Sequence, residues 1–200
     1  MKTDKTIEYY EKNAELFTAG TLNVEFNDVQ DWFLSYIPKG GMILDFGCGS
    51  GRDTKYFLEK GYKVDAIDGS EALCEIASNN TGIRVRHMYF DELDEFEEYD
   101  GIWACASILH LPIEELQDVF FKMIHALRNS GYIYSSFKYG DFEGYRNDRY
   151  FTDFTEKKFQ LFISNLPELT MIEKRITLDV RPGRDNEKWL NIIMRKSDII

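Results

Sequence analysis

The sequence predicts an α/β fold in which helices cover both faces of a mostly parallel sheet. Short apolar runs alternate with helical segments through the middle of the chain, which is typical of strand-helix-strand units. Two further strand-like runs near the end are joined by so short a turn that they must pair antiparallel. The 200 residues suffice for one core and contain no Pro/Gly/Ser-rich linker, so we expect a single domain over residues 1–200.

Helices are expected before the sheet begins. Ile7, Tyr10, Ala14 and Phe17 recur at spacings of three and four, which places them on one helix face. A second helix fits residues 27–37, and the Pro-Lys-Gly-Gly sequence that follows ends it.

The sheet elements then follow in order. Strands are expected at residues 42–46, 62–67, 83–88, 101–105 and 132–137. Helices are expected between them at residues 52–60, 70–79 and 113–128. A last helix at residues 155–165 precedes the antiparallel runs at residues 171–180 and 189–195.

Composition limits the function classes. The formal net charge of -11 repels phosphate backbones, and the basic residues are scattered, so nucleic acid is a disfavoured substrate. No apolar run is long enough to span a bilayer, and the first residues lack signal or transit character, so we expect a cytoplasmic protein without membrane contact. The three cysteines form no CxxC pair and fit a reducing compartment.

A glycine-rich turn, GCGSG at residues 47–51, directly follows the first strand and precedes a helix at Arg52. A tight structural turn would use glycines in the same way, so the context must decide. No Gly-Lys-Ser/Thr follows, which excludes a Walker A loop. A dinucleotide fingerprint needs a small residue where Arg52 stands. Asp45 beside the turn would repel a pyrophosphate and attract a cation such as a sulfonium or ammonium group.

The sequence DFGCGSG at residues 45–51 resembles the D/E-x-G-x-G-x-G motif of class I S-adenosylmethionine-dependent methyltransferases. The resemblance covers nearly the whole chain. It implies a Rossmann-like three-layer sandwich with a seven-stranded sheet of order 3-2-1-4-5-7-6, strand 7 antiparallel, over residues 41–200. It also implies an N-terminal helical lid over residues 1–38. The cofactor would be S-adenosylmethionine and the product S-adenosylhomocysteine, with turn contacts from Asp45, Gly47, Cys48, Gly49 and Gly51.

Further cofactor contacts are expected along the sheet. The resemblance implies that Asp68, followed by Gly69 after the second strand, accepts hydrogen bonds from the ribose hydroxyls, since a carboxylate suits a vicinal diol. The alternative is that Asp68 caps the next helix. The family's adenine-binding acid would fall at Tyr89, so Phe90 against the ring and Asp91 as amino partner are the substitutes, with core and solvated loop as the alternative.

The end of the fourth strand is expected to face the methionine part of the cofactor. Cys105 and Ala106 are small there and permit close approach. His110 in the following loop is the candidate general base, because its ordinary pKa of about 6.5 suits proton transfer. A packing or capping role is the alternative. No HxxxH, HExxH or cysteine cluster occurs, so no metal site is expected.

Candidate acceptor contacts come from three segments. Tyr9 and Tyr10 lie in the segment that resembles a lid helix, where their rings could equally pack on the core. Arg149 and Tyr150 close a polar, tyrosine-rich segment after the fifth strand, and Arg184 lies in the last turn. The arginines would bind an anionic group, and solvated loop residues are the alternative.

The sequence thus favours methyl transfer to a small-molecule acceptor by in-line displacement. The nearest resemblance is to stand-alone bacterial enzymes related to tellurite-resistance methyltransferases, which implies a soft oxyanion acceptor. A non-catalytic S-adenosylmethionine-binding regulatory protein and an NAD-dependent oxidoreductase are the alternatives. The sequence leaves the acceptor atom and the oligomeric state open.

Overall fold

A computed structural model describes residues 5–197, so the ends of the expected domain, residues 1–4 and 198–200, lie outside the described part of the chain. The helices are α1 (Lys5–Lys12), α2 (Ala14–Ala19), α3 (Asn27–Leu34), α4 (Arg52–Glu59), α5 (Glu71–Thr81), α6 (Ile113–Ala126) and α7 (Glu156–Ile163), with short 3-10 helices η1 (Phe90–Glu92) and η2 (Ile108–His110). The strands are β1 (Met42–Phe46), β2 (Lys63–Asp68), β3 (Arg86–His87), β4 (Tyr99–Ala104), β5 (Leu127–Lys138), β6 (Glu143–Arg146), β7 (Arg149–Thr152), β8 (Leu169–Leu178) and β9 (Lys188–Lys196).

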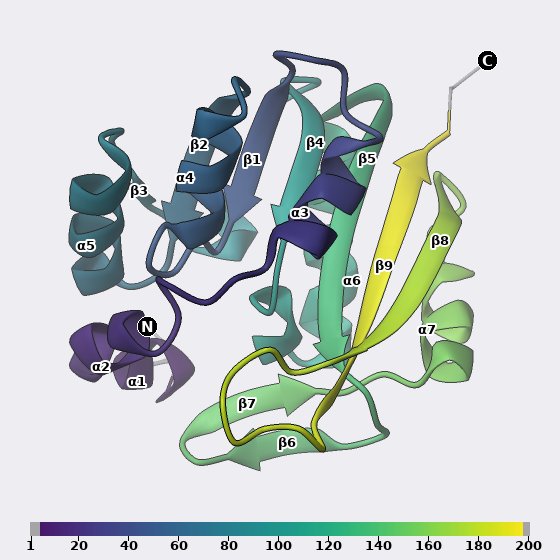
Figure 1. The fold of residues 1–200 in the computed structure, drawn as a ribbon. Helices are drawn as coiled ribbons and strands as arrows, with labels where there is room; N and C mark the ends of the chain where they lie inside the picture. The colour runs from purple at the N-terminus through teal and green to yellow at the C-terminus, as the bar shows by residue number, and fades with distance from the viewer. Residues whose placement is uncertain (1–4, 198–200) are drawn as a thin grey trace.

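The predicted sheet topology is confirmed. Seven strands form one sheet in the order β3-β2-β1-β4-β5-β9-β8, in which β8 and β9 are the sixth and seventh strands (Figure 1). The first five strands run parallel, and β9 is antiparallel to both β5 and β8. The fold is therefore the Rossmann-like arrangement that the sequence predicts.

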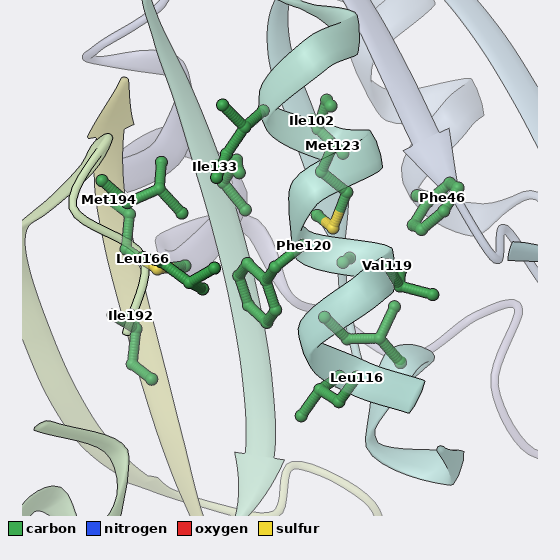
Figure 2. Packing of buried hydrophobic residues seen from close by; sticks show 14 of the residues in the cluster. Phe46, Ile102, Leu116, Val119, Phe120, Met123, Ile133, Leu166, Ile192 and Met194 are labelled. Carbon is green, nitrogen blue, oxygen red and sulfur yellow. The ribbon is translucent and has the colours of Figure 1, made fainter. Parts of the chain in front are cut away.

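The two faces of the sheet bury separate clusters because successive strand residues point to opposite sides. In β1, Ile43 packs with residues of α3 and α4, whereas Leu44 and Phe46 pack with residues of α6 and α7. Figure 2 shows the second cluster, in which Phe120 and Met123 of α6 lie against the sheet. Both faces are thus covered, as a parallel sheet requires.

The structure differs from the sequence prediction in four elements. The helix expected at residues 113–128 ends at Ala126 and the fifth strand already begins at Leu127, because Leu127 pairs with Tyr99 of β4. The first helix breaks at Asn13, whose side-chain amide donates to the Tyr9 carbonyl at 2.7 Å and competes with the helical pattern. The third strand retains only two residues. The segment expected as a loop contains a hairpin, β6–β7, whose two turn residues Asn147 and Asp148 have φ of 47° and 62°.

The carboxyl ends of the parallel strands are covered by distant parts of the chain. In Figure 1, the hairpin and helices α1 and α2 both lie beyond these strand ends. None of the helices in the described part is long and apolar enough to cross a membrane. Within residues 5–197, no group of three or more His, Cys, Asp or Glu side chains is arranged to hold a metal ion.

Candidate active site

A cavity of about 1150 Å³ opens at the carboxyl ends of the parallel strands. This is where ligands bind in open α/β sheets. Its walls come from the glycine turn, the end of β2, the η1 and η2 segments, α1, the β6–β7 hairpin and the turn between β8 and β9. The volume exceeds the range of about 300–1000 Å³ typical of single-ligand pockets. The cavity therefore has room for two molecules.

The three glycines of the turn all have positive φ, between 55° and 88°. A Cβ on Gly47 would lie 2.5 Å from the Cβ of Ser107, and one on Gly51 would lie 2.8 Å from Cγ2 of Thr81 in α5. Gly47 and Gly49 line the cavity, whereas Gly51 faces α5. Gly51 thus lets helices α4 and α5 approach each other closely, and it does not line the cavity.

Asp68 lies at the end of β2 and lines the cavity together with Gly69. Its two carboxylate oxygens accept hydrogen bonds from the backbone N–H groups of Gly49 at 2.8 Å and Ser70 at 2.9 Å. Burial raises the pKa of Asp68, and these two N–H donors oppose that shift. Each oxygen retains a lone pair for a ligand, so the carboxylate can still bind a diol while it supports the turn.

Asp45 does not line the cavity. Its buried carboxyl accepts a hydrogen bond from the Thr54 hydroxyl at 2.6 Å. Burial and the neighbouring Asp53 both raise the pKa of Asp45, which disfavours its charged form. The expectation that Asp45 attracts a cation beside the turn is therefore not met, and Asp45 supports the turn from inside the protein.

The remaining predicted cofactor residues surround the same space. Phe90 packs onto the end of β1, and the exposed Asp91 follows it. Burial raises the pKa of the Cys105 thiol to about 12, so this thiol stays protonated. The predicted cofactor residues that line the cavity are Gly47, Cys48, Gly49, Asp68, Gly69, Phe90, Asp91, Cys105 and Ala106.

His110 of η2 also lines the cavity, and both of its ring nitrogens are hydrogen-bonded. Nδ1 lies 2.6 Å from the Tyr150 carbonyl oxygen, and Nε2 lies 2.8 Å from the Tyr10 hydroxyl. Because a carbonyl only accepts, Nδ1 carries the proton and Nε2 accepts from Tyr10. Burial lowers the pKa of His110 to about 4, so the ring is neutral at pH 7.

Arg149 and Tyr150 of β7 join this group from the hairpin, and both line the cavity. The Arg149 guanidinium lies 4.5 Å from the centroid of the Tyr9 ring, and its Nη1 donates to the Tyr10 hydroxyl at 3.4 Å. Tyr9 itself does not line the cavity. Arg184 does, and it is paired with a carboxylate of the same turn at 3.6 Å.

Two residues of α1 and α2 line the cavity but were not predicted as site residues. Glu11 of α1 accepts hydrogen bonds from the Ser70 hydroxyl at 2.6 Å and from the first turn of α5. Phe17 of α2 covers the turn, with its ring 2.9 Å from the position of a Cβ on Gly49. Phe17 was on the predicted helix face, but only the tertiary structure places that face over the turn.

The fold and the site together define a class of protein. A seven-stranded sheet with an antiparallel last strand, a glycine turn after β1 and an acid at the end of β2 is the class I S-adenosylmethionine-dependent methyltransferase arrangement. A family model described as a methyltransferase domain matches residues 43–131. This match and the relatives described below support an enzyme of the methyltransferase type that uses S-adenosylmethionine as cofactor.

The individual relatives and solved structures that resemble this chain have low sequence identity to it. An uncharacterized methyltransferase of Staphylococcus carnosus is 27% identical over an alignment of 181 positions that covers 82% of this chain and 87% of that protein. The 1,6-didemethyltoxoflavin-N1-methyltransferase of Burkholderia thailandensis has the same fold, with a TM-score of 0.74 and 22% identity over 96% of this chain and 85% of its own. The N-methyltransferase NodS of Bradyrhizobium japonicum has a TM-score of 0.71 and 14% identity over 93% and 97% of the two chains.

Proposed function

We propose that the protein transfers a methyl group from S-adenosylmethionine to a small-molecule acceptor by in-line displacement inside the cavity. One observation carries this proposal: the glycine turn and Asp68 line the same cavity as Tyr10, His110 and Arg149. When bound, the cofactor supplies a methyl group that its sulfonium already activates. The chain has to hold the acceptor in line with that methyl group and exclude water.

The cavity residues around the glycine turn suit the chemical groups of S-adenosylmethionine. The free lone pairs of Asp68 suit the two ribose hydroxyls. Phe90 would face the adenine ring with Asp91 near its amino group, and Cys105 and Ala106 leave room for the methionine part.

The Tyr10–His110 pair would remove the acceptor's proton. Nε2 of His110 is already occupied by the Tyr10 hydroxyl, so an acceptor meets the Tyr10 oxygen before it meets the ring. On methylation, the acceptor's proton would pass to the Tyr10 oxygen and the proton of Tyr10 to Nε2 of His110. Because burial lowers the pKa of His110 to about 4, the ring would hold this proton only briefly before releasing it to solvent.

Residues 1–38 would act as the lid within a single domain, because α1 and α2 reach both sides of the cavity. Tyr10, Arg149, Tyr150 and Arg184 would form the acceptor wall, and Tyr9 would support Arg149 from outside the cavity. The small-molecule acceptor is supported by the concave cavity and by the net charge of -11, which disfavours nucleic acid. The three unpaired cysteines support a cytoplasmic location.

Two measurements test this proposal. Calorimetry with S-adenosylmethionine, S-adenosylhomocysteine and NAD should detect the sulfur nucleotides and not NAD. Binding of NAD alone would contradict the proposal. A screen for S-adenosylhomocysteine release across hydroxyl, amine, thiol and oxyanion acceptors then separates an enzyme from a regulatory binder, since a binder releases none with any class.

The ribose role of Asp68 has its own test. Asp68→Ala should weaken S-adenosylhomocysteine binding by roughly 1 to 3 kcal/mol, the range for unpaired hydrogen-bonding groups in a site. Asp65→Ala is the matched control, because Asp65 lies in the same strand and contacts Tyr99 outside the cavity. Equal affinities of the two variants would remove Asp68 from the ribose role.

A further inference from the structure

Within residues 5–197, the cavity contains one guanidinium that has no carboxylate counter-ion. We propose that Arg149 binds the anionic group of an aromatic acceptor, a ring that bears a carboxylate and carries the nucleophilic hydroxyl or amine elsewhere. This inference rests on the proposed methyl transfer and names the class of its substrate.

The other basic side chains that line the cavity are held by the protein. Arg52 pairs with Asp53, Arg181 with Asp179, Lys138 and Arg184 with Glu187, and Lys122 donates to the Leu93 carbonyl. These side chains have their charges or donors satisfied without a ligand.

Arg149 differs from the other arginines that line the cavity. Among residues 5–197, no carboxylate lies within 4 Å of its guanidinium, although the chain carries 35 acidic residues. Its Nε is buried without a hydrogen-bond partner, and the 3.4 Å contact from Nη1 to the Tyr10 hydroxyl is long for a hydrogen bond. An enclosed cation without a counter-ion is costly for the protein alone. A ligand anion would remove that cost.

The surroundings of Arg149 indicate an aromatic ligand. Its guanidinium lies 4.5 Å from the Tyr9 ring and 5.3 Å from the Phe151 ring, so its orientation is fixed before any ligand arrives. Tyr10, Tyr145 and Trp189 also line the cavity. Aromatic walls favour a planar ring, whose two faces they can cover.

The position of Arg149 also relates the anion to the proposed chemistry. Nη1 bonds the Tyr10 hydroxyl, which in turn bonds Nε2 of His110. An acid held by Arg149 would therefore keep the rest of its ring beside the group that accepts the proton. A guanidinium recognises a carboxylate through two parallel N–H donors, which fixes the plane of the ring as well as its place.

Calorimetry in saturating S-adenosylhomocysteine tests this with 4-hydroxybenzoate and its uncharged analogue 4-hydroxybenzamide. In the unmodified protein we expect the acid to bind about tenfold more tightly than the amide or better. Arg149→Gln should abolish this preference. Arg175→Gln is the matched control, because it removes a guanidinium that stacks 4.1 Å from the Trp32 ring outside the cavity.

The outcomes separate this inference from the proposed function. Failure of the unmodified protein to bind S-adenosylhomocysteine contradicts the proposed function before either aromatic probe is added. Normal S-adenosylhomocysteine binding with no preference for the acid overturns the role of Arg149. A tenfold loss of S-adenosylhomocysteine affinity in Arg149→Gln would assign Arg149 to the cofactor's carboxylate and likewise overturn it. Selenite binding more tightly than 4-hydroxybenzoate would overturn the aromatic part, and an inorganic oxyanion would be the ligand.

Discussion

The two sides of the cavity are built in different ways. On the cofactor side, the glycine turn at residues 47–51 and Asp68 lie close in sequence, and backbone geometry of adjacent strands fixes them. On the acceptor side, Tyr10, His110 and Arg149 come from three elements, with 100 residues between Tyr10 and His110 and 139 between Tyr10 and Arg149. The first side therefore depends on local conformation, and the second depends on how distant elements dock.

The largest expected effect is a loss of stability, and it shows how tightly the cofactor side is packed. Gly47→Ala should lower the free energy of unfolding by about 2 to 5 kcal/mol, because a positive φ costs a residue with Cβ about 1 to 2 kcal/mol and overpacking adds about 1 to 3 kcal/mol. The added methyl would lie 2.5 Å from Ser107. Urea unfolding measures the change.

Gly61→Ala is the matched control for the backbone term. Gly61 has a φ of 85°, close to the 88° of Gly47, but no atom lies within 4 Å of a Cβ placed on it. It should therefore lose only the backbone cost. Equal losses of unfolding free energy in the two variants would mean that the turn shifts to accommodate the extra methyl group. The cofactor side would then not be more rigid than the acceptor side.

The sequence predicts the cofactor side well for this reason. The glycines, the strand before them and the acid seventeen positions after Gly51 are local signals that require no knowledge of packing. The alternating elements likewise predict the sheet order and the antiparallel end. Asp45 is the exception, because the motif does not reveal that Thr54 and burial turn this carboxyl away from the cavity.

The acceptor side could be predicted only as single residues. The β6–β7 hairpin has mixed polar strands that pair with each other alone, so its pattern is that of a solvated loop. The Asn147–Asp148 pair was the available turn signal between residues rich in tyrosine and arginine. Nothing local indicates that Arg149 meets Tyr9 or that His110 meets Tyr10, because those contacts arise only when the hairpin and α1 dock.

The docking of the acceptor side buries His110 and makes the stability of the protein depend on pH. The folded-state pKa of His110 is about 4, below its unfolded value of about 6.5, so the unfolded chain binds the extra proton first as the pH falls. The stability that neutral His110 provides is therefore present above pH 6.5 and is lost as the pH falls toward 4. Between pH 7 and pH 5 the loss should be about 2 kcal/mol.

Urea unfolding of His110→Gln at pH 7 and pH 5 isolates the pH-dependent stability that His110 contributes. Glutamine can donate to the Tyr150 carbonyl and accept from Tyr10, but it does not titrate. The raised pKa values of Asp45 and Asp68 give the opposite pH dependence, and they cancel when the variant is compared with the unmodified protein. An identical pH dependence in both proteins would mean that His110 is not enclosed in solution.

The smallest expected effect lies where the two sides meet, in α1. Glu11 bonds Ser70 and the N-terminus of α5 on the cofactor side, whereas the adjacent Tyr10 bonds His110 on the acceptor side. Because Glu11 is exposed, Glu11→Ala should cost only about 0.3 to 1 kcal/mol, the range for a carboxylate at a helix N-terminus. This loss of stability should appear as faster hydrogen exchange of the α1 amides.

The matched control is Glu15→Ala, which removes an exposed carboxylate from α2 and should leave α1 exchange unchanged. If Glu11 holds α1 against the cofactor side, binding of S-adenosylhomocysteine should slow α1 exchange less in Glu11→Ala than in Glu15→Ala. The same helix carries Tyr10, so the cofactor would then order the acceptor side through α1 before an acceptor arrives. Equal protection in both variants would mean that the two sides fold around their ligands independently.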